Sequence, residues 1–353
     1  QSFLYPFGFS SSGAPILAPL TTQLRYETDS RSMAVYTQLS YTPDLLEDRL
    51  RVTGGLRYTR DKKEVQLLTL NTGGSESWSS VNPSLTVEYQ VTEEANLYAK
   101  VSTGYNAGGF NVRANSADVF ENPVDEETLI NYELGFKSEW LDRRVRLNGA
   151  LFSMDYKDMQ VSQFVAGASG AATELRNAGK SRINGIELEL TAMLTSQLVV
   201  NAGWGHIDYE YKEYITSKNE ITGEVIDSAD TAGPVLSPRN SLNAGIEYSF
   251  EPSAVGVFSP RLDATYTGAQ DFHPFLTEHI SADSRTLING RIMLDEIPVS
   301  AGDLRLSLWG KNLADEEYRA NGIDFGVDAG SLGFAGVIYG PRRSYGIDLV
   351  YNF

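Results

Sequence analysis

The last ten residues, SYGIDLVYNF (344–353), carry the pattern that decides the fold. If this segment is extended, one of its faces carries Tyr345, Ile347, Leu349, Tyr351 and Phe353. The opposite face carries Gly346, Asp348, Val350 and Asn352. Because the side chains of a strand point alternately to its two faces, this order predicts a β-strand with one apolar face and one mainly polar face.

The same period of two recurs along most of the chain and predicts about thirteen strands. We place them at residues 31–41, 49–61, 83–92, 95–106, 127–141, 143–157, 175–193, 196–212, 238–250, 259–271, 284–297, 302–318 and 342–353. Most have ten residues or more, whereas strands of soluble proteins usually have about five or six. A strand that crosses a membrane needs about 9–11 residues, so these lengths favour a membrane protein.

Connections of two lengths alternate between the predicted strands. The short ones lie near residues 42–48, 92–94, 142, 194–196, 251–258 and 298–301. The long ones are 62–82, 107–126, 158–174, 213–237, 272–283 and 319–341. Short turns at one end and long loops at the other are typical of an all-β, antiparallel, up-and-down transmembrane barrel, whose long loops are extracellular. A large soluble β-barrel or sandwich is the alternative, since alternation is common to both.

Charged residues keep to the polar faces of the predicted strands. They include Arg51, Arg57, Lys100, Arg146, Arg291 and Arg305, together with Glu88, Glu133, Glu187, Glu189, Glu247, Asp263 and Asp295. A charge that faces lipid costs about 2–4 kcal/mol at the bilayer midplane, so the charged face is expected to line the lumen. Aromatic residues gather near the strand ends, where such barrels carry aromatic girdles.

The composition excludes several other classes of protein. The chain has 353 residues, no cysteine, three histidines and a formal net charge of −17. Without cysteine there is no disulfide framework and no cysteine-based zinc site. The sequence contains no apolar run of about 18 residues and therefore no transmembrane helix. The negative charge argues against a nucleic-acid surface, and the start at Gln1 lacks the pattern of a secretory signal.

The odd number of predicted strands has a consequence for closure. Neighbouring strands of an antiparallel barrel alternate in direction, so single-chain bacterial barrels have an even number of strands. The strands at 31–41 and 342–353 run in the same direction and cannot pair with each other. Residues 1–30, interrupted by prolines, are predicted to be an extracellular loop segment. We therefore expect residues 31–353 to be part of a larger barrel, because an open sheet leaves unpaired backbone groups in lipid.

Six segments carry a family resemblance. They are SLTVEYQVTEEANLYAKVSTGYNAGGFN (84–111), RVRLNGALFSMDYKDMQV (144–161), NAGKSRINGIELEL (177–190), PRNSLNAGIEYSF (238–250), KNLADEEY (311–318) and YGPRRSYGIDLVYNF (339–353). In this order they resemble the C-terminal barrel region of TonB-dependent outer-membrane receptors. The resemblance implies a barrel of about 22 strands around a plug domain, of which this chain holds the last strands and lacks the plug and the TonB box.

The resemblance also implies a function and a set of partners. We expect a receptor in the outer membrane of a Gram-negative bacterium that actively takes up a large nutrient, with a ferric siderophore as the default ligand. The TonB–ExbB–ExbD complex would act through the absent plug, and the barrel assembly machinery would insert the strands among outer-membrane lipid. No enzyme activity, cofactor or nucleic-acid partner is expected. A passive porin, an outer-membrane enzyme and a soluble β-protein are the alternatives.

The predicted outer loops and lumen supply the candidate ligand-binding residues. Aromatic and amide side chains at a barrel mouth suit the capture of a bulky amphipathic ligand. The candidates are Asn106, Phe110, Arg113, Phe120, Tyr156, Phe164, Arg319, Asn321, Phe325 and Phe334. Loop aromatics also pack against one another, which is the simpler interpretation for any single one of them.

Three further features have a functional and a structural interpretation. The terminal Phe353 is predicted to be the signal that the assembly machinery reads, the alternative being an ordinary girdle aromatic. The carboxylates of Glu187 and Glu189 lie about 7 Å apart on one strand face and are interpreted as structural, not catalytic. His273 and His279 share a loop, but their spacing matches no helical zinc motif, and no metal site is expected.

Overall fold

One antiparallel sheet dominates the structure. The computed structural model describes residues 4–9, 15–19, 25–68, 71–112, 117–167, 170–218, 224–275, 279–324 and 334–353. Within these residues the main sheet has 14 strands, one of which, β11, is a short branch that pairs only with β10. The remaining thirteen form a single path in which each strand pairs antiparallel with the next.

The thirteen strands of this path follow the chain order. They are β3 (Tyr26–Tyr41), β4 (Leu50–Leu67), β5 (Thr72–Gln90), β6 (Ala95–Asn106), β7 (Glu127–Trp140), β8 (Val145–Gly167), β9 (Gly170–Met193), β10 (Leu198–Lys218), β12 (Asn240–Tyr248), β13 (Val257–Thr267), β14 (Arg285–Val299), β15 (Gly302–Lys311) and β18 (Ser344–Asn352). The other elements are β1 (Leu4–Phe9), β2 (Pro15–Pro19), α1 (Ala117–Glu121), β11 (Val225–Asp227), β16 (Arg319–Asp324) and β17 (Ala335–Tyr339).

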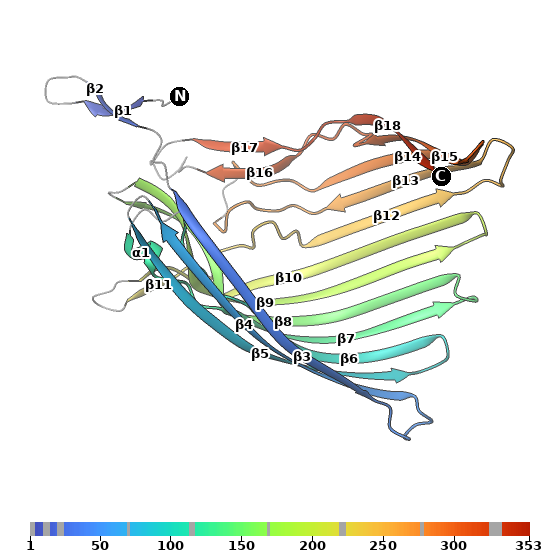
Figure 1. The fold of residues 1–353 in the computed structure, drawn as a ribbon, viewed down its shortest axis with the longest axis horizontal. Helices are drawn as coiled ribbons and strands as arrows, with labels where there is room; N and C mark the ends of the chain where they lie inside the picture. Colours follow the sequence, from blue (N-terminus) through green and yellow to red (C-terminus); the bar gives the residue numbers. More distant parts are fainter. Residues whose placement is uncertain are drawn as a thin grey trace.

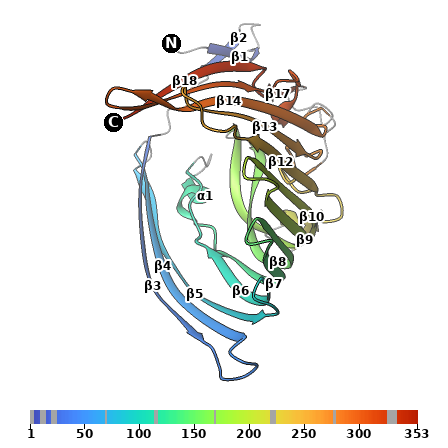
Figure 2. The ribbon, with the colours of Figure 1, turned by 90° about the vertical axis from the view of Figure 1, so that its right-hand side faces the viewer.

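The sheet is strongly curved but open, and it does not close into a barrel. Figure 2 shows that it curves through most of a circle, with β3 at one margin and β18 at the other. These two strands are the ends of the path and are not paired with each other in the described residues. The prediction of thirteen strands, up and down and antiparallel, is confirmed, and so is the prediction that this set of strands does not close.

The strands project much further on the long-loop side than the sequence predicts. β8 and β9 have 23 and 24 residues, about twice what is needed to cross a membrane. The predicted long loops 62–82 and 158–174 were therefore wrong, because both are hairpin arms whose strands end only near residues 67–72 and 167–170. Lipid does not cover the outer face of these arms, so their sequences lack the strict alternation of apolar and polar residues that would reveal a strand.

The two faces of the sheet differ in the way a membrane wall requires. Exposed apolar side chains gather on the convex outer face, among them Leu56, Leu85, Val101, Leu134, Leu151, Ile246, Leu262, Ile292, Leu308 and Ile347. Towards the long-loop end this apolar belt gives way to charges, such as the ion pair of Arg182 with Asp155 at 2.7 Å. The change from apolar to charged side chains marks the outer edge of the membrane.

The N-terminal residues are not a simple loop. β1 and β2 pair with each other antiparallel, from Leu4 opposite Pro19 to Phe9 opposite Pro15, and β3 begins at Tyr26, earlier than predicted. The hairpin lies near the long-loop end of the molecule (Figure 1). The division into a loop segment of residues 1–30 and a barrel wall of residues 31–353 stays a prediction.

Among the residues that the structure describes, the buried side chains form three small clusters and not one continuous core. A single curved sheet encloses no second layer, so most of its side chains remain accessible. The clusters centre on Phe120, Tyr214 and Ile280, and all three involve connections or strand extensions at the long-loop end. The packed part of the lumen is therefore at the outer mouth.

No helix in the described part of the chain is long and apolar enough to cross a membrane.

Candidate site at the outer mouth

The inner wall carries charges of both signs that neutralise one another across neighbouring strands. Arg261 on β13 is the centre of one network: its guanidinium donates to Asp263 at 2.6 and 3.0 Å, to Glu247 at 3.3 Å and to Asn201 at 3.2 Å. Arg305 pairs in the same way with Asp295 at 2.7 Å. Mutual pairing makes these groups part of the wall, in keeping with the structural interpretation of the lumen charges.

The connection of residues 107–126, here called the inner loop, folds into the concave side of the sheet. Figure 2 shows α1, which belongs to this loop, within the concavity of the sheet. The Phe120 ring is fully buried and packs against Val65 and Leu67 on the inner face of β4. Phe110 packs against the same cluster and meets the Trp78 ring edge to face at 6.4 Å. Both candidate aromatics therefore hold the loop against the wall.

Polar side chains pin the inner loop to the opposite strands. Gln160 of β8 donates from its side chain to the carbonyls of Ala107 at 3.1 Å and Asp125 at 3.0 Å. Asn177 of β9 also donates to Asp125, at 2.9 Å. On the other side, the Lys63 ammonium donates to the carbonyl of Gly108 at 2.6 Å. The loop is thus tied to β4 on one side and to β8 and β9 on the other.

Asn111 adds the most specific of these contacts. Its amide nitrogen donates to the carbonyl of Leu175 at 3.0 Å, and its oxygen accepts from the Leu175 N–H at 2.6 Å. Asn111 is only 8% exposed, so both bonds are made away from bulk water. An amide that pairs with both backbone groups of one residue takes the place of a neighbouring strand.

A polar cavity of about 470 Å³ lies where β6 diverges from β5. We call it the β6 pocket; its lining includes Arg57, Asp61, Lys63, Asn82, Tyr105 and Asn106. The Tyr105 hydroxyl donates to Asp61 at 2.8 Å, and the Asn106 amide donates to Glu127 at 3.1 Å. Candidate Asn106 therefore borders a pocket that offers cations, a carboxylate and amides to a polar ligand.

Tyrosines form a second inner surface on β8 and β10, here called the tyrosine band. Tyr156 and Tyr211 both pair with Ser181 of β9, so they flank it in one row of the inner face. The rings of Tyr209, Tyr211, Tyr214 and Phe275 then follow one another edge to face at 5.0, 4.9 and 5.6 Å. This band brings candidate Tyr156 together with aromatic residues that the sequence analysis did not select.

Three candidates lie apart from this group, on the hairpin of β16 and β17. Arg319 donates to the carbonyl of Ser281 at 2.9 Å, Asn321 is exposed, and Phe334 is 53% exposed just before β17. The hairpin packs through Ala335 and Val337 on the cluster of Phe272, Ile280 and Ala282. The structure thus divides the described candidates between two parts of the mouth.

The remaining candidates lie outside what the structure describes. Arg113 and Phe325 are outside the described residues, and so is the side chain of Phe164, whose backbone belongs to β8.

The terminal Phe353 is fully exposed beyond the end of β18.

Two of the three histidines make hydrogen bonds with neighbouring residues of the chain. His206 shares a hydrogen bond with Asn240 at 2.9 Å, and His273 Nδ1 lies 3.1 Å from the Phe275 carbonyl. Within the described residues no three histidine or acidic side chains come together in a way that would hold a metal ion.

Two loop carboxylates have altered acidity. Burial raises the pKa of Asp271, in the connection after β13. The N–H of Arg343, which donates to Asp315 at 3.0 Å, lowers the pKa of that carboxyl, and the nearby charges of Arg342 and Arg343 lower it further.

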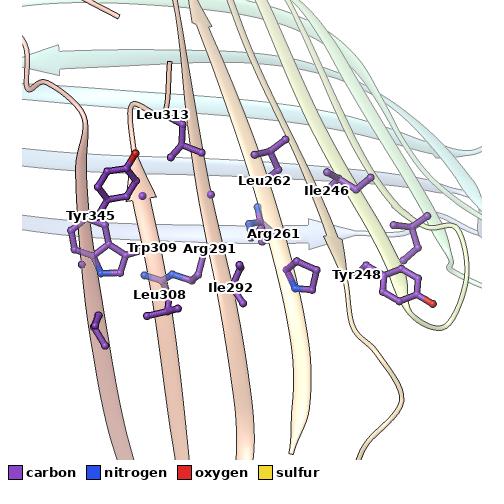
Figure 3. Close-up of a pocket in the computed structure, with 16 residues that line it drawn as sticks. Ile246, Tyr248, Arg261, Leu262, Arg291, Ile292, Leu308, Trp309, Leu313 and Tyr345 are labelled. Atoms are coloured by element: carbon purple, nitrogen blue, oxygen red, sulfur yellow. The ribbon is translucent and has the colours of Figure 1, made fainter. Parts of the chain in front are cut away.

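A large, mainly apolar cavity is on the other side of the wall. It has a volume of about 970 Å³, and Figure 3 shows its lining side chains spread across neighbouring strands of the sheet. Its apolar lining, including Ile246, Leu262, Ile292 and Leu308, belongs to the outer face described above. This outer groove faces the membrane and is no part of the mouth.

The sequence predicted the region of the mouth but not its packing. Lys63 and Gln160 were missed because the predicted loops 62–82 and 158–174 hid the strands β4 and β8 that carry them. Asn177 was missed because an amide on a predicted strand gives no local signal of a loop contact. Tyr209 and Tyr211 were visible as alternate residues of one strand, a spacing that does indicate a shared aromatic face.

The fold and the sequence pattern agree with one protein family. Residues 2–313 match the model of the family described as "TonB dependent receptor-like, beta-barrel". The chain belongs to this family. TonB-dependent receptors are β-barrels of the outer membrane of Gram-negative bacteria, which places this wall in that membrane.

Individual relatives are similar over part of their length. The pesticin receptor of Yersinia pestis is 33% identical over 168 residues, which are 46% of this chain and 24% of that receptor. The probable TonB-dependent siderophore receptor PiuA of Acinetobacter baumannii is 25% identical over 217 residues, or 57% of this chain and 27% of the receptor. The chain thus matches about a quarter of the length of these curated relatives.

Solved receptor structures share the fold. The ferric yersiniabactin uptake receptor FyuA of Yersinia pestis superposes with a TM-score of 0.70 at 23% identity, covering 93% of this chain and 46% of FyuA. PiuA gives a TM-score of 0.69 at 18% identity, covering 96% of this chain and 46% of PiuA. The TonB-dependent receptor chain therefore spans about half the length of these structures, and its family relatives are transport receptors.

Proposed function

We propose that the full-length protein is a receptor that binds a large ferric chelate at its outer mouth and takes it up with energy delivered through TonB. The observation that carries the proposal is the pairing of two inner surfaces at the mouth of a TonB-dependent receptor wall. The tyrosine band offers aromatic rings, and the β6 pocket offers charges and amides. A siderophore complex presents an organic shell of this mixed kind, with apolar rings and polar chelating groups.

The ligand contacts divide between the two parts of the mouth. We assign Tyr156 and Asn106 to the inner part, and Arg319, Asn321 and Phe334 to the hairpin of β16 and β17. Arg113, Phe164 and Phe325 remain candidate contacts. Phe110 and Phe120 act through the inner loop, which they hold in place against β4. The names of the receptors that match in sequence, for pesticin and for siderophores, support this ligand class.

The remaining partners follow from the same proposal. The TonB–ExbB–ExbD complex supplies the energy through a plug and a TonB box outside this chain. The exposed aromatic Phe353, at the free end of β18, is the contact for the barrel assembly machinery, which adds strands at such an edge. Replacing Phe353 with alanine is expected to lower the amount of folded receptor in the membrane, while receptor with an alanine at exposed Leu194 assembles normally.

Equilibrium binding tests the ligand class. The full-length receptor is purified, and tryptophan fluorescence follows the titration with a panel of ferric siderophores and with the iron-free forms. We expect at least one ferric complex to bind, and Tyr156→Ala to weaken it about five-fold through the loss of roughly 1 kcal/mol of aromatic contact.

Tyr132→Ala is the matched control, because Tyr132 is a half-exposed tyrosine of the outer face. It should leave binding unchanged. If no ferric complex of the panel binds, or if Tyr132→Ala weakens binding as much as Tyr156→Ala does, the proposal is contradicted.

A further inference from the structure

The β6 pocket holds a cation to which the surrounding wall gives no ion pair. Arg57, on the inner face of β4, donates through Nε to the Thr59 hydroxyl at 3.0 Å. This bond fixes the guanidinium beside the pocket and leaves both of its terminal nitrogens for other acceptors. Within the described residues Arg57 forms no ion pair, whereas Arg261 and Arg305 of the same wall each pair with an aspartate.

The neighbours of Arg57 across the sheet are uncharged. Its register partners are Tyr36 on β3 and Asn82 on β5. Asn82 lines the β6 pocket together with Arg57, and its amide group can both donate and accept a hydrogen bond. One end of the pocket therefore presents a guanidinium and an amide on adjacent strands.

The other two charges of the pocket offset each other. Asp61 and Lys63 follow Arg57 on the same face of β4, and each has a partner of its own. The Asp61 carboxylate accepts from the Tyr105 hydroxyl at 2.8 Å, and the Lys63 ammonium donates to a carbonyl of the inner loop at 2.6 Å. Glu76, the register partner of Lys63, is exposed and does not line the pocket. The pocket thus has one positive charge in excess, that of Arg57.

The size and charge of the pocket fit an organic carboxylate. Its volume of about 470 Å³ lies within the range of about 300–1,000 Å³ that is usual for small-molecule sites. A guanidinium binds a carboxylate through two parallel hydrogen bonds. The single charge of a carboxylate matches the excess charge of the pocket. A phosphate group carries almost two negative charges and would also be repelled by Asp61.

We propose that Arg57, with Asn82 beside it, binds a free carboxylate of the ligand, so that the cargo is a chelate with a carboxylate that does not hold the metal. This inference rests on the proposed function for the nature of the cargo. The site itself rests only on the geometry and charge of the β6 pocket. Arg57 then determines specificity, because it favours chelates with a charged arm over otherwise similar neutral ones.

Benzoate and benzamide are the probes for the site, because they have nearly the same shape and differ in charge. Saturation-transfer NMR of the purified full-length receptor measures their dissociation constants. We expect benzoate to bind about five-fold more tightly, since hydrogen bonds between charged groups are roughly twice as strong as neutral ones. Arg57→Gln should remove this preference. Arg51→Gln is the control, because Arg51 lies on the same face of β4, about 20 Å closer to the short-turn end.

Asp61→Asn tests the charge balance of the pocket. Asparagine keeps an oxygen that can accept from the Tyr105 hydroxyl but removes the negative charge, so benzoate should bind more tightly while benzamide binding stays the same. Equal binding of benzoate and benzamide to the native receptor would overturn the proposal. So would a preference for benzoate that survives in Arg57→Gln, or that Arg51→Gln lowers to the same extent.

Ferric complexes separate this site from the proposed cargo. A ferric siderophore with a free carboxylate should bind more tightly than its methyl ester, and Arg57→Gln should abolish the difference. If benzoate binding depends on Arg57 but no ferric complex binds, the proposed function fails and the carboxylate site stands. If the free acid and the ester of the ferric complex bind equally well, the proposed function stands and the role of Arg57 in choosing the cargo is refuted.

Discussion

Asn111 shows how a single side chain can organise a loop inside a barrel wall. Its amide pairs with both backbone groups of Leu175 and so joins the inner loop to β9. Phe120 and Phe110 were predicted as ligand contacts because aromatics in a long loop suit a mouth. The structure buries Phe120 completely against β4 instead. Local sequence cannot distinguish the two outcomes, because the partners Val65 and Leu67 are about fifty residues away.

Asn111→Ala is expected to release the inner loop. The change leaves the Leu175 N–H and carbonyl without their partner in a buried place, at a cost of about 1–3 kcal/mol. Hydrogen exchange of the full-length receptor should show faster exchange at Leu175 and in residues 107–112. Asn122→Ala is the control, since Asn122 bonds only within the turn of α1. Unchanged protection at Leu175 would contradict the role given to Asn111.

The hydrogen bond from the Arg343 N–H to Asp315, just before β18, is expected to depend on pH. The lowered pKa of Asp315 means that the carboxylate form stabilises this contact above the usual aspartate pKa of about 3.9. The stabilisation is lost only as the pH falls through the lowered folded value. Exchange of the Arg343 amide, corrected for its intrinsic rate, should stay slow at pH 5 and rise below the usual pKa. A rise above that pKa, or no difference between the native protein and Asp315→Ala, would be inconsistent with this prediction.

At the scale of elements, the membrane decides what a sequence can reveal. β6 lies within the apolar belt, and its bounds, Ala95–Asn106, are those predicted, because lipid on one face and lumen on the other impose alternation. The arms of β8 and β9 leave the membrane, lose that pattern and were missed. That the sheet stays open was predicted correctly from the strand directions. In a path with an odd number of antiparallel strands, the two end strands run in the same direction and cannot pair antiparallel with each other.

The alternation of β6 can be measured with two neighbouring positions. Val101 lies on the outer face and Ser102 on the inner face, and the native chain has no cysteine to interfere. A nitroxide label on Val101→Cys should be accessible to oxygen and shielded from a water-soluble nickel complex in the membrane. The label on Ser102→Cys should be shielded from lipid. Because a shift of one residue reverses every side chain, the opposite result would place β6 in the wrong register.

At the scale of the molecule, the open sheet limits what the chain does alone. All 16 residues of β3 are exposed, and β3 and β18 are unpaired margins of the described sheet. Each unpaired backbone group costs several kcal/mol in lipid. We therefore propose that this chain supplies one part of the barrel wall, and that the remaining strands and a plug lie elsewhere in the same protein.

Refolding separates the chain from the proposed full-length receptor. The isolated residues 1–353 should fail to enter lipid vesicles as a stable, protease-resistant barrel, because both margins remain unpaired. The full-length receptor should insert and migrate in electrophoresis as a compact species that heating converts to the unfolded one. Stable insertion of the isolated chain as a monomer would show that this sheet closes without further strands.

We propose that this wall belongs to an energised receptor for a ferric chelate. Uptake of radioactive iron, supplied as the best-binding ferric siderophore, tests it in cells that produce the full-length receptor with and without functional TonB. We predict accumulation that requires both the receptor and TonB. Equal accumulation without TonB would show a passive channel, and none in either strain would show that ferric chelates are not its cargo.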